Sequence, residues 1–314
     1  MDMIICHNSA LDHWRLHGNA KIEASARQRR RTLPEKFPSI TEILDRVPVG
    51  LPYPIDLMVI SNNAKWKSKV FKSHVYTGNI PEWSFISLGP GVYVSSPSFC
   101  FFQMSGELPL VKLIELGLEL CGTYSLPVNN GETLYGHPRL TNVNSLKAFT
   151  IQMKGIKGQG KATRALRFIA DGSASPMETK LFMLLTLKYI LGGYGLLAPT
   201  LNKRVDPRKA TKQMANKKYF VCDLLWPQEN LAVEYDSDAN HTGADRINDD
   251  SKKRIALESA GIKVITVTNE QIQSADELDI VAKEIAKRLG KRLRMNDPKF
   301  KKAQRELRRQ LGLQ

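Results

Sequence analysis

The sequence has few cysteines and lacks a long hydrophobic stretch. Its cysteines are Cys6, Cys100, Cys121 and Cys222. They lie far apart without a Cys-x-x-Cys pair, which predicts reduced thiols rather than a zinc knuckle or a disulfide framework. The most apolar stretch, 181–201, is interrupted by Lys188 and by Gly192-Gly193, so we expect no membrane span. The N-terminus lacks the apolar core of a signal peptide, and we therefore expect a cytoplasmic protein.

Neither extreme polarity nor low complexity marks the composition. Hydrophobic residues make up 42% and charged residues 25% of the 314 positions, which excludes a largely disordered or collagen-like chain. A chain of this length predicts two domains. It can bury an ordinary core without disulfides or metals.

Acidic residues are scarce relative to basic ones. The chain has 46 Lys and Arg against 31 Asp and Glu, a net charge of +15. The excess gathers in three segments, namely 283–311 with +9, 203–218 with +6 and 21–31 with +4. A concentrated positive field favours a polyanionic partner, and nucleic acid is the commonest. The alternative is a solvated surface that favours solubility.

The first half predicts an α+β module over residues 1–170. We expect residues 1–45 to be mainly helical, including 10–17. Short β-rich runs bounded by Gly, Pro and Asn predict strands at 58–60, 74–76, 85–88 and 92–94. Helices are expected at 97–104, 109–121, 145–153 and 160–170, with a loop at 126–145. Small helices followed by short strands suit a winged-helix-like module.

The second half predicts a compact α/β unit over 171–290, followed by a basic tail at 291–314. Ser175-Pro176-Met177-Glu178 is a capping box with Pro at the first helical position, so a helix begins there. Strands are expected at 219–226, 231–237 and 262–267, and further helices at 249–260 and 275–290.

A predicted hairpin in this unit gathers three acids on one face. With a turn at 227–230, Trp226 pairs with Leu231, and Asp223 lies opposite Glu234 with the Cβ atoms ~4.5–5.5 Å apart. Asp236 falls on the same face. The other face, with Phe220, Cys222, Leu224, Trp226, Leu231, Val233 and Tyr235, is apolar and belongs to the core.

Opposed carboxylates predict a cation between them. Like charges directly opposite in a sheet are destabilising, and oxygen-rich sites suit Mg²⁺ or Mn²⁺. We therefore expect Asp223 and Glu234 to hold the metal. The alternative is a solvent-exposed strand face with incidental acids, and a one-residue slip in the register would separate the pair.

The same residues carry a resemblance to a known family. The order is Glu178 on a helix, Asp223 on a strand, Glu234-Tyr235-Asp236 on the next, and then His241, Asp250, Lys253, Leu257 and Gly261. This order resembles the PD-(D/E)XK nuclease superfamily, and within it the very-short-patch-repair-like endonuclease domains. The match covers residues 175–272, about a third of the chain, and depends on order, spacing and element type together.

Two positions depart from the pattern of that family. Asp236 stands where the signature has Lys, and Ser237 where the branch often has Gly. The very-short-patch branch uses His chemistry in place of the Lys, which implies His241 as general base or acid; a loop histidine without a role is the alternative. Glu178 would join the acidic site and equally suits a helix cap. Lys253 would contact a phosphate or be an ordinary helix-surface lysine.

The first half has a looser resemblance. The residues 9–15, the strand pair around 89–91 and the segment 95–118 resemble the winged-helix module of type IV abortive-infection antitoxins. That module occurs fused to such nuclease domains in bacterial proteins. Its presence implies a regulator-like, DNA-binding first domain.

Together the resemblances imply a restriction-endonuclease-like domain after a winged-helix-like module. The expected activity is Mg²⁺- or Mn²⁺-dependent cleavage of DNA, in a bacterial defence or toxin–antitoxin-like role. Because the signature Lys is missing, the alternative is a DNA-binding transcriptional regulator whose nuclease domain is inert. RNA stays open as substrate, since metal sites of this type cleave either polymer.

Overall fold

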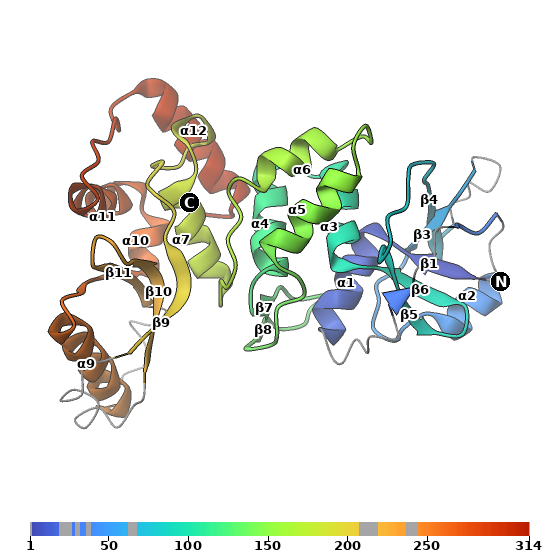
Figure 1. The fold of residues 1–314 in the computed structure, drawn as a ribbon, viewed down its shortest axis with the longest axis horizontal. Coiled ribbons are helices and arrows are strands. Elements are labelled where there is room, and N and C mark those ends of the chain that lie inside the picture. Colours follow the sequence, from blue (N-terminus) through green and yellow to red (C-terminus); the bar gives the residue numbers. More distant parts are fainter. Residues whose placement is uncertain are drawn as a thin grey trace. The chain divides into compact units, whose positions relative to one another are not determined.

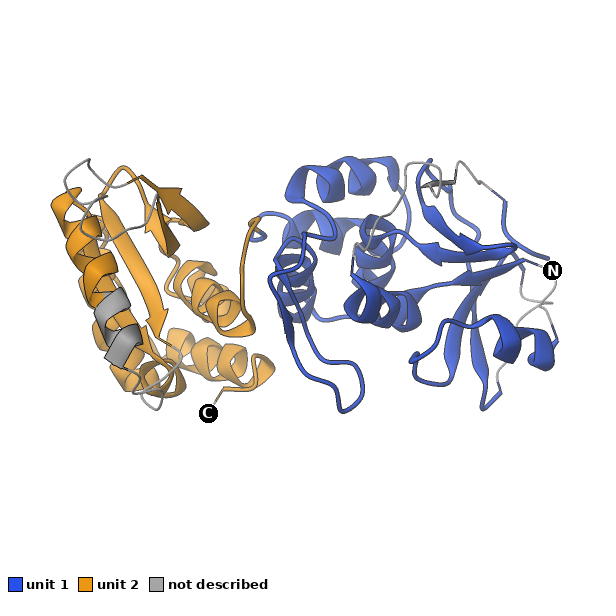
Figure 2. Ribbon diagram, turned by 90° about the horizontal axis from the view of Figure 1, so that it is seen from below, with its two compact units in different colours: residues 1–169 blue, residues 170–314 orange. Residues whose placement is uncertain are grey.

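The chain folds into two compact units, residues 1–169 and residues 170–314 (Figure 2). The computed structural model describes residues 2–18, 27–28, 32–35, 39–61, 68–206, 219–236 and 244–313. Both units combine helices with a mixed β-sheet, so the chain belongs to the expected α+β class. Within the described residues, every helix is too short or too polar to cross a lipid bilayer.

The first unit is built on a six-stranded sheet with the order β2-β5-β6-β1-β3-β4 (Figure 1). Its elements are β1 (Met3–Ile5), α1 (His7–His17), β2 (Arg27–Gln28), α2 (Ile40–Arg46), β3 (Ile55–Val59), β4 (Phe71–Val75), β5 (Phe85–Gly89), β6 (Val92–Ser95), α3 (Pro97–Ser105), α4 (Leu110–Leu120), β7 (Tyr124–Ser125), β8 (Leu134–Tyr135), α5 (Val143–Gln152) and α6 (Gln159–Ala165). Strand β1 is parallel to β6, and β3 is parallel to β4.

The start of the chain is where the predicted secondary structure of this unit is wrong. Residues 3–5, expected within a helical segment, form the central strand β1, and all three side chains are buried. A strand covered on both faces has a continuous apolar run instead of alternation, and three residues are too few to be recognised as one. The predicted strands between 58 and 94 correspond to β3–β6. In the expected loop at 126–145, β8 pairs with β7.

The second unit holds a four-stranded sheet with the order β12-β11-β10-β9. Its elements are α7 (Pro176–Thr186), the 3₁₀ turn η3 (Tyr189–Leu191), β9 (Thr200–Val205), β10 (Phe220–Trp226), β11 (Leu231–Asp236), α9 (Ala244–Ser259), β12 (Lys263–Thr268), α10 (Asn269–Gln273), α11 (Ala275–Arg288) and α12 (Pro298–Gln310). Strands β9, β10 and β11 are antiparallel, whereas β12 is parallel to β11. A parallel pair needs a crossover, and α9 supplies it.

The segment 291–314, expected as a separate basic tail, belongs to the second unit. Helix α12 buries Phe300, Gln304, Leu307 and Leu311 on one face. These positions follow the helical spacing i, i+4, i+7 and i+11, a pattern that a count of charges does not detect. Packing of this face against the rest of the unit therefore stabilises the helix.

Buried polar contacts attach α12 to its neighbours. Lys301 Nζ lies 2.6 Å from Asp279 Oδ2, and the Tyr194 hydroxyl donates to Asp279 Oδ1 over 2.7 Å. The guanidinium of Arg308, which is 3% exposed, donates to the carbonyls of Ile272 and Gln273. Two of the basic groups counted toward the charge of the tail are therefore engaged inside the unit.

Candidate active site

The hairpin of β10 and β11 places the acids. Trp226 pairs with Leu231, Leu225 with Ala232 and Leu224 with Val233, so the predicted turn and register are confirmed at this end. Asn230 closes the turn with φ 47°, a left-handed conformation that Asn tolerates better than most residues. The register brings Asp223 on β10 to the level of Glu234 and Tyr235 on β11.

At Asp223 the regular alternation of the hairpin stops. The carboxylate Oδ2 accepts a hydrogen bond of 2.8 Å from the backbone N–H of Tyr235. On the neighbouring strand β9, Asn202 has φ 45°. The β9–β10 pairs of Lys203 with Cys222 and of Leu201 with Leu224 lie on either side of it. Asp223 therefore bonds to the backbone of β11 as well as approaching the carboxyl group of Glu234.

This irregularity changes which side chains share a face. Phe220 and Cys222 belong to the same buried cluster as Leu225 and Ala232, although strict alternation puts the two pairs on opposite faces. Burial first, and then the nearby Glu234 carboxylate, raise the pKa of the Cys222 thiol to about 12. The predicted division of the hairpin into an acidic face and an apolar face is thus wrong in the first half of β10. Cys222, predicted on the apolar face, lies on the same face as Glu234.

Lys253 is brought to Glu234 by the packing of α9. Ala256 and Leu257 of this helix are buried against the hairpin. Lys253 precedes them by three and four residues, so it shares their helix face. Its Nζ lies 2.6 Å from Glu234 Oε2. Lys253 is therefore part of the site and not an ordinary lysine of the helix surface.

Glu234 keeps one oxygen without a partner. Its side chain is 14% exposed, and Oε1 is buried without a hydrogen-bond partner among the described residues. Leaving a buried acceptor unsatisfied costs ~1–3 kcal/mol. Such an atom is suited to a ligand that the protein itself does not supply.

Glu178 approaches the hairpin from the first turn of α7. Ser175 caps the helix by accepting the Glu178 backbone N–H over 3.1 Å. Glu178 Oε2 in turn accepts the N–H of Ala174 over 3.1 Å, one residue before the position that a reciprocal capping box requires. Asn202 Nδ2 donates to the same oxygen over 2.6 Å. Glu178 thus combines a capping role with a place beside Asp223, whose charge acts on it.

Burial and mutual repulsion shift the three carboxyl groups in one direction. Burial raises the pKa of Glu178 and of Asp223. Burial and then the Asp223 charge raise the pKa of Glu234 to about 7. Burial lowers the pKa of Lys253, but the Glu234 carboxylate outweighs it and holds that pKa above the ordinary value. Near neutral pH the pair of Asp223 and Glu234 therefore exchanges a proton readily.

One predicted site residue lies away from this group, and another falls outside the described residues. Asp236 ends β11 with an exposed side chain, paired in the ladder with Thr268 of β12. His241 lies outside the described residues, as does most of the basic segment 203–218. Two further residues, Asn202 and Cys222, contact or influence the acids without having been predicted. Asn202 lies in a strand that the sequence did not indicate.

The acids do not form the tightest cluster of metal-ligating atoms. Among the described His, Cys, Asp and Glu side chains, the group whose ligand atoms all lie within 4.8 Å of one another is Cys6, His7 and His74 in the first unit. Adjacent Cys and His at positions 6 and 7 are a weak signal by themselves, and His74 is remote in sequence. In the second unit, Lys253 and Asn202 bond to the carboxylates of Glu234 and Glu178 respectively.

Basic side chains line a surface hollow of the second unit. The hollow is formed by the end of α11 and the segment before α12. Its basic residues are Lys283, Lys287, Lys291, Arg292 and Arg294. Lys291 also donates to the carbonyl of Gly195, whereas the other four side chains are exposed.

Comparison of the chain with protein-family models, with curated proteins and with solved structures found no match.

Proposed function

We propose that the chain is a metal-dependent endonuclease that hydrolyses phosphodiester bonds of DNA. The observation that carries the proposal is the half-buried group of Asp223, Glu234 and Lys253 on β10, β11 and α9, with the buried Glu178 on α7 beside it. The sequence of helix, strand, strand, helix and strand is the one that the resemblance to the PD-(D/E)XK superfamily implies. Charged groups held in this way can stabilise the charge that develops in the transition state of phosphoryl transfer.

The two acids of the hairpin suit Mg²⁺ or Mn²⁺. Glu234 Oε1 is buried without a hydrogen-bond partner among the described residues, and oxygen donors are the ligands that these ions prefer. Asp223 and Glu234 would hold the ion, with Glu178 in support. A bound ion of this kind supplies Lewis acidity toward a phosphoryl oxygen and lowers the pKa of a water molecule.

The other residues of the group act on protons and on charge. Glu234 binds a cation only in its deprotonated form, and burial together with the Asp223 charge, which raise its pKa to about 7, oppose that form. Lys253 supplies the positive charge that Asp236 cannot supply at the position of the signature Lys, and it reaches the same carboxylate from α9. His241 is assigned the role of general base or leaving-group acid, since its ordinary pKa lies near neutrality.

Substrate affinity comes from phosphate contacts. The exposed cations of the hollow at 283–294 suit a nucleic-acid backbone, which carries no sequence information in itself. The first unit, which resembles an antitoxin module in sequence, would add DNA binding, and the same resemblance would give it a role in bacterial defence in the cytoplasm. Its six-stranded sheet with parallel pairs differs from the small antiparallel sheet of a winged helix.

A DNA-binding regulator with an inert nuclease domain is the second candidate. One observation favours it: Glu234, which would hold the metal, and Glu178, which would support it, already have protein partners, Lys253 and Asn202 respectively. In that case the acids and Lys253 form a closed network that stabilises the unit, and no cation is bound there.

Cleavage of supercoiled plasmid separates the two candidates. We expect wild-type protein to nick or linearise plasmid with Mg²⁺ or Mn²⁺ and not with EDTA, and Asp223→Asn to lose at least ~10²–10³-fold of the rate. Lewis-acid stabilisation is worth several kcal/mol, and each 1.36 kcal/mol is tenfold in rate. Glu258→Gln is the control, because it removes an exposed acid from α9.

The other outcomes identify the alternatives. Binding of plasmid without cleavage under either metal would favour the regulator. Full activity of Asp223→Asn would remove Asp223 from the mechanism. A structured RNA tested in parallel decides the polymer, since preferential cleavage of RNA would replace DNA as the substrate.

A further inference from the structure

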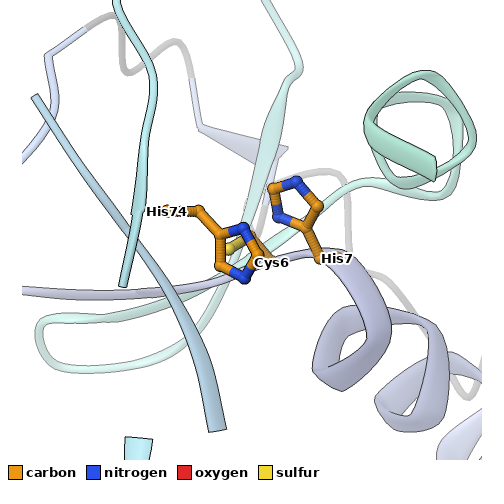
Figure 3. Close-up of side chains that lie close together, drawn as sticks. All are labelled: Cys6, His7 and His74. Atoms are coloured by element: carbon orange, nitrogen blue, oxygen red, sulfur yellow. The ribbon is translucent and has the colours of Figure 1, made fainter. Parts of the chain in front are cut away.

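A second group of ligating side chains lies in the first unit, at the point where β1 leads into α1. Cys6 is the N-cap residue of α1, His7 is its first residue, and His74 lies on β4. One ligand atom from each lies within 4.8 Å of the other two. Figure 3 shows the three side chains gathered there, with His74 entering from a different strand. Tertiary packing joins residues that are more than 60 positions apart.

The backbone around Cys6 and His7 is held in an uncommon conformation. His7 has φ 48°, a left-handed value that residues other than Gly seldom adopt. The N–H of Cys6 donates to the Asp56 carbonyl over 2.9 Å, and the N–H of His7 donates to Gln103 Oε1 over 3.1 Å. Backbone outliers that surrounding contacts enforce are concentrated at functional sites. The contacts here aim two consecutive side chains at His74.

A buried carboxylate orients the ring of His74. Its Nε2 donates to Asp56 Oδ1 over 2.7 Å, and Asp56 is 5% exposed. That hydrogen bond places the proton on Nε2 and leaves Nδ1 with a lone pair. Carboxylate–histidine pairs of this kind accompany metal-ligating histidines and raise the basicity of the ligand.

A fourth donor faces the two rings. Glu107 Oε1 lies 3.8 Å from His7 Nε2 and 4.0 Å from His74 Nδ1, too far for hydrogen bonds and close to both nitrogens. The rings of His7 and His74 are stacked with centroids 3.8 Å apart, so one ring has to turn about its side-chain bonds before both can direct a nitrogen at the same ion. The other nitrogen of His7, Nδ1, is buried without a hydrogen-bond partner among the described residues. Direct hydrogen bonds thus leave the polar atoms of this group only partly satisfied.

We propose that Cys6, His7 and His74 bind a Zn²⁺ ion, and that Glu107, which lies outside their 4.8 Å group but close to both rings, moves in as fourth ligand. Thiolate and imidazole donors suit Zn²⁺, whereas Mg²⁺ prefers oxygen ligands throughout. Four protein ligands are typical of a structural zinc site. The ion would connect the start of α1 to β4 and to the end of α3. Glu107, half-exposed at the rim of a hollow lined by His7, Lys72 and His74, gives the ion a path from solvent.

Uptake of the ion exchanges a proton for the metal. The Cys6 thiol, whose pKa burial raises well above its ordinary value, releases its proton to solvent as the zinc–sulfur bond forms. Burial lowers the pKa of His7 to about 3, so its ring is already neutral and able to ligate at neutral pH.

The test measures metal content and spectra of the full chain, independently of nuclease activity. Wild-type protein, stripped with chelator and reloaded, is expected to retain one Zn²⁺ per chain after desalting. Co²⁺ in its place is expected to give a thiolate-to-cobalt charge-transfer band. Cys6→Ser and His74→Ala are expected to lose both. Cys121→Ser, another buried cysteine of this unit, and Asp223→Asn in the second unit are expected to keep both.

Milder variants keep the test decisive if Cys6→Ser fails to fold. Glu107→Gln changes a half-exposed residue, and Asp56→Asn removes only the charge behind His74. Loss of an outer partner typically costs 10–100-fold in metal affinity, so Co²⁺ titration is expected to show that drop for Asp56→Asn. The proposal is overturned if wild-type protein retains no Zn²⁺ and shows no charge-transfer band, or if Cys6→Ser and Asp56→Asn bind as wild type does.

Discussion

The two clusters of buried ionisable groups differ in what burial does to them. In the second unit burial raises the pKa values of Glu178, Asp223 and Glu234, which keeps protons on acids. In the first unit burial lowers the pKa of His7, which removes a proton from a base. Both shifts have one cause, since low dielectric disfavours charge. The second unit thus offers carboxyl oxygens as donors, and the first unit offers uncharged nitrogen and sulfur donors.

The clusters also differ in how they are compensated. Glu234 has a cation, Lys253, at 2.6 Å, whereas His74 has an anion, Asp56, at 2.7 Å. A positive neighbour competes with a metal ion for a carboxylate. A negative neighbour strengthens an imidazole as a metal ligand. The comparison therefore predicts a weakly held, exchangeable ion in the second unit and a tightly held ion in the first.

Replacement of Lys253 tests the largest effect that this comparison predicts. Lys253→Ala is expected to lower the cleavage rate roughly 10²-fold or more, the usual size for a group that stabilises transition-state charge. It also leaves Glu234 without its partner, so the free energy of unfolding should fall by about 1–3 kcal/mol. Urea denaturation and plasmid cleavage measure the two effects. Lys252→Ala is the control, since it removes the same charge from the neighbouring position, and equal behaviour of the two variants would place Lys253 outside the site.

The pH dependence of stability should have opposite signs in the two clusters. Glu234 has a pKa raised from 4.5 to about 7 on folding, so the native state holds a proton that the unfolded state releases in that range. Its contribution to the free energy of unfolding is therefore present at low pH and is lost as pH rises from 4.5 through 7. Urea denaturation of wild type and Glu234→Gln, with chelator present, isolates this contribution as the difference between their pH profiles.

His7 provides the opposite sign. Its pKa falls from 6.5 to about 3 on folding, so the unfolded state holds the additional proton. Its contribution is present above 6.5 and is lost as pH falls toward 3. His7→Asn is the matched variant, because Asn tolerates the left-handed backbone of this position. Difference profiles of the same sign for Glu234→Gln and His7→Asn would contradict the contrast between the clusters.

The smallest predicted effect concerns exposed lysines in the basic hollow of the second unit. Lys283→Gln with Lys287→Gln, in the basic hollow, is expected to reduce the slope of log affinity for duplex DNA against log salt by roughly 2, since each phosphate contact adds about 0.9. Lys154→Gln with Lys157→Gln removes two exposed charges from the first unit as a control. A larger change in this slope for the control pair would indicate that the first unit, and not the basic hollow, contacts the DNA.

A deletion of residues 292–314 would not test DNA binding. It removes the buried side chains of Phe300, Leu307 and Leu311 together with the charges, so it unfolds or weakens the second unit. Surface substitutions that retain α12 separate affinity from stability. The distinction arises because one helix presents cations on one face and a core-packing stripe on the other.

Local sequence determined much of the second unit. The turn at 227–230 sets the register of Trp226 and Leu231, since the length of a hairpin loop determines its pairing. Ser175 and Pro176 determine where α7 begins, because a side-chain cap and a fixed φ act within one turn. The acids of β10 and β11 were placed near one another by the same local rules.

Tertiary structure alone decided which side chains meet across elements. Lys253 reaches Glu234 because Ala256 and Leu257 dock α9 on the hairpin, and His74 joins Cys6 and His7 because β3 lies between β1 and β4 in the sheet. Periodicity specifies a face, but the partner of that face depends on packing between segments far apart in the chain. The residues that give both clusters their chemistry are therefore present in the sequence, but only folding brings them close to one another.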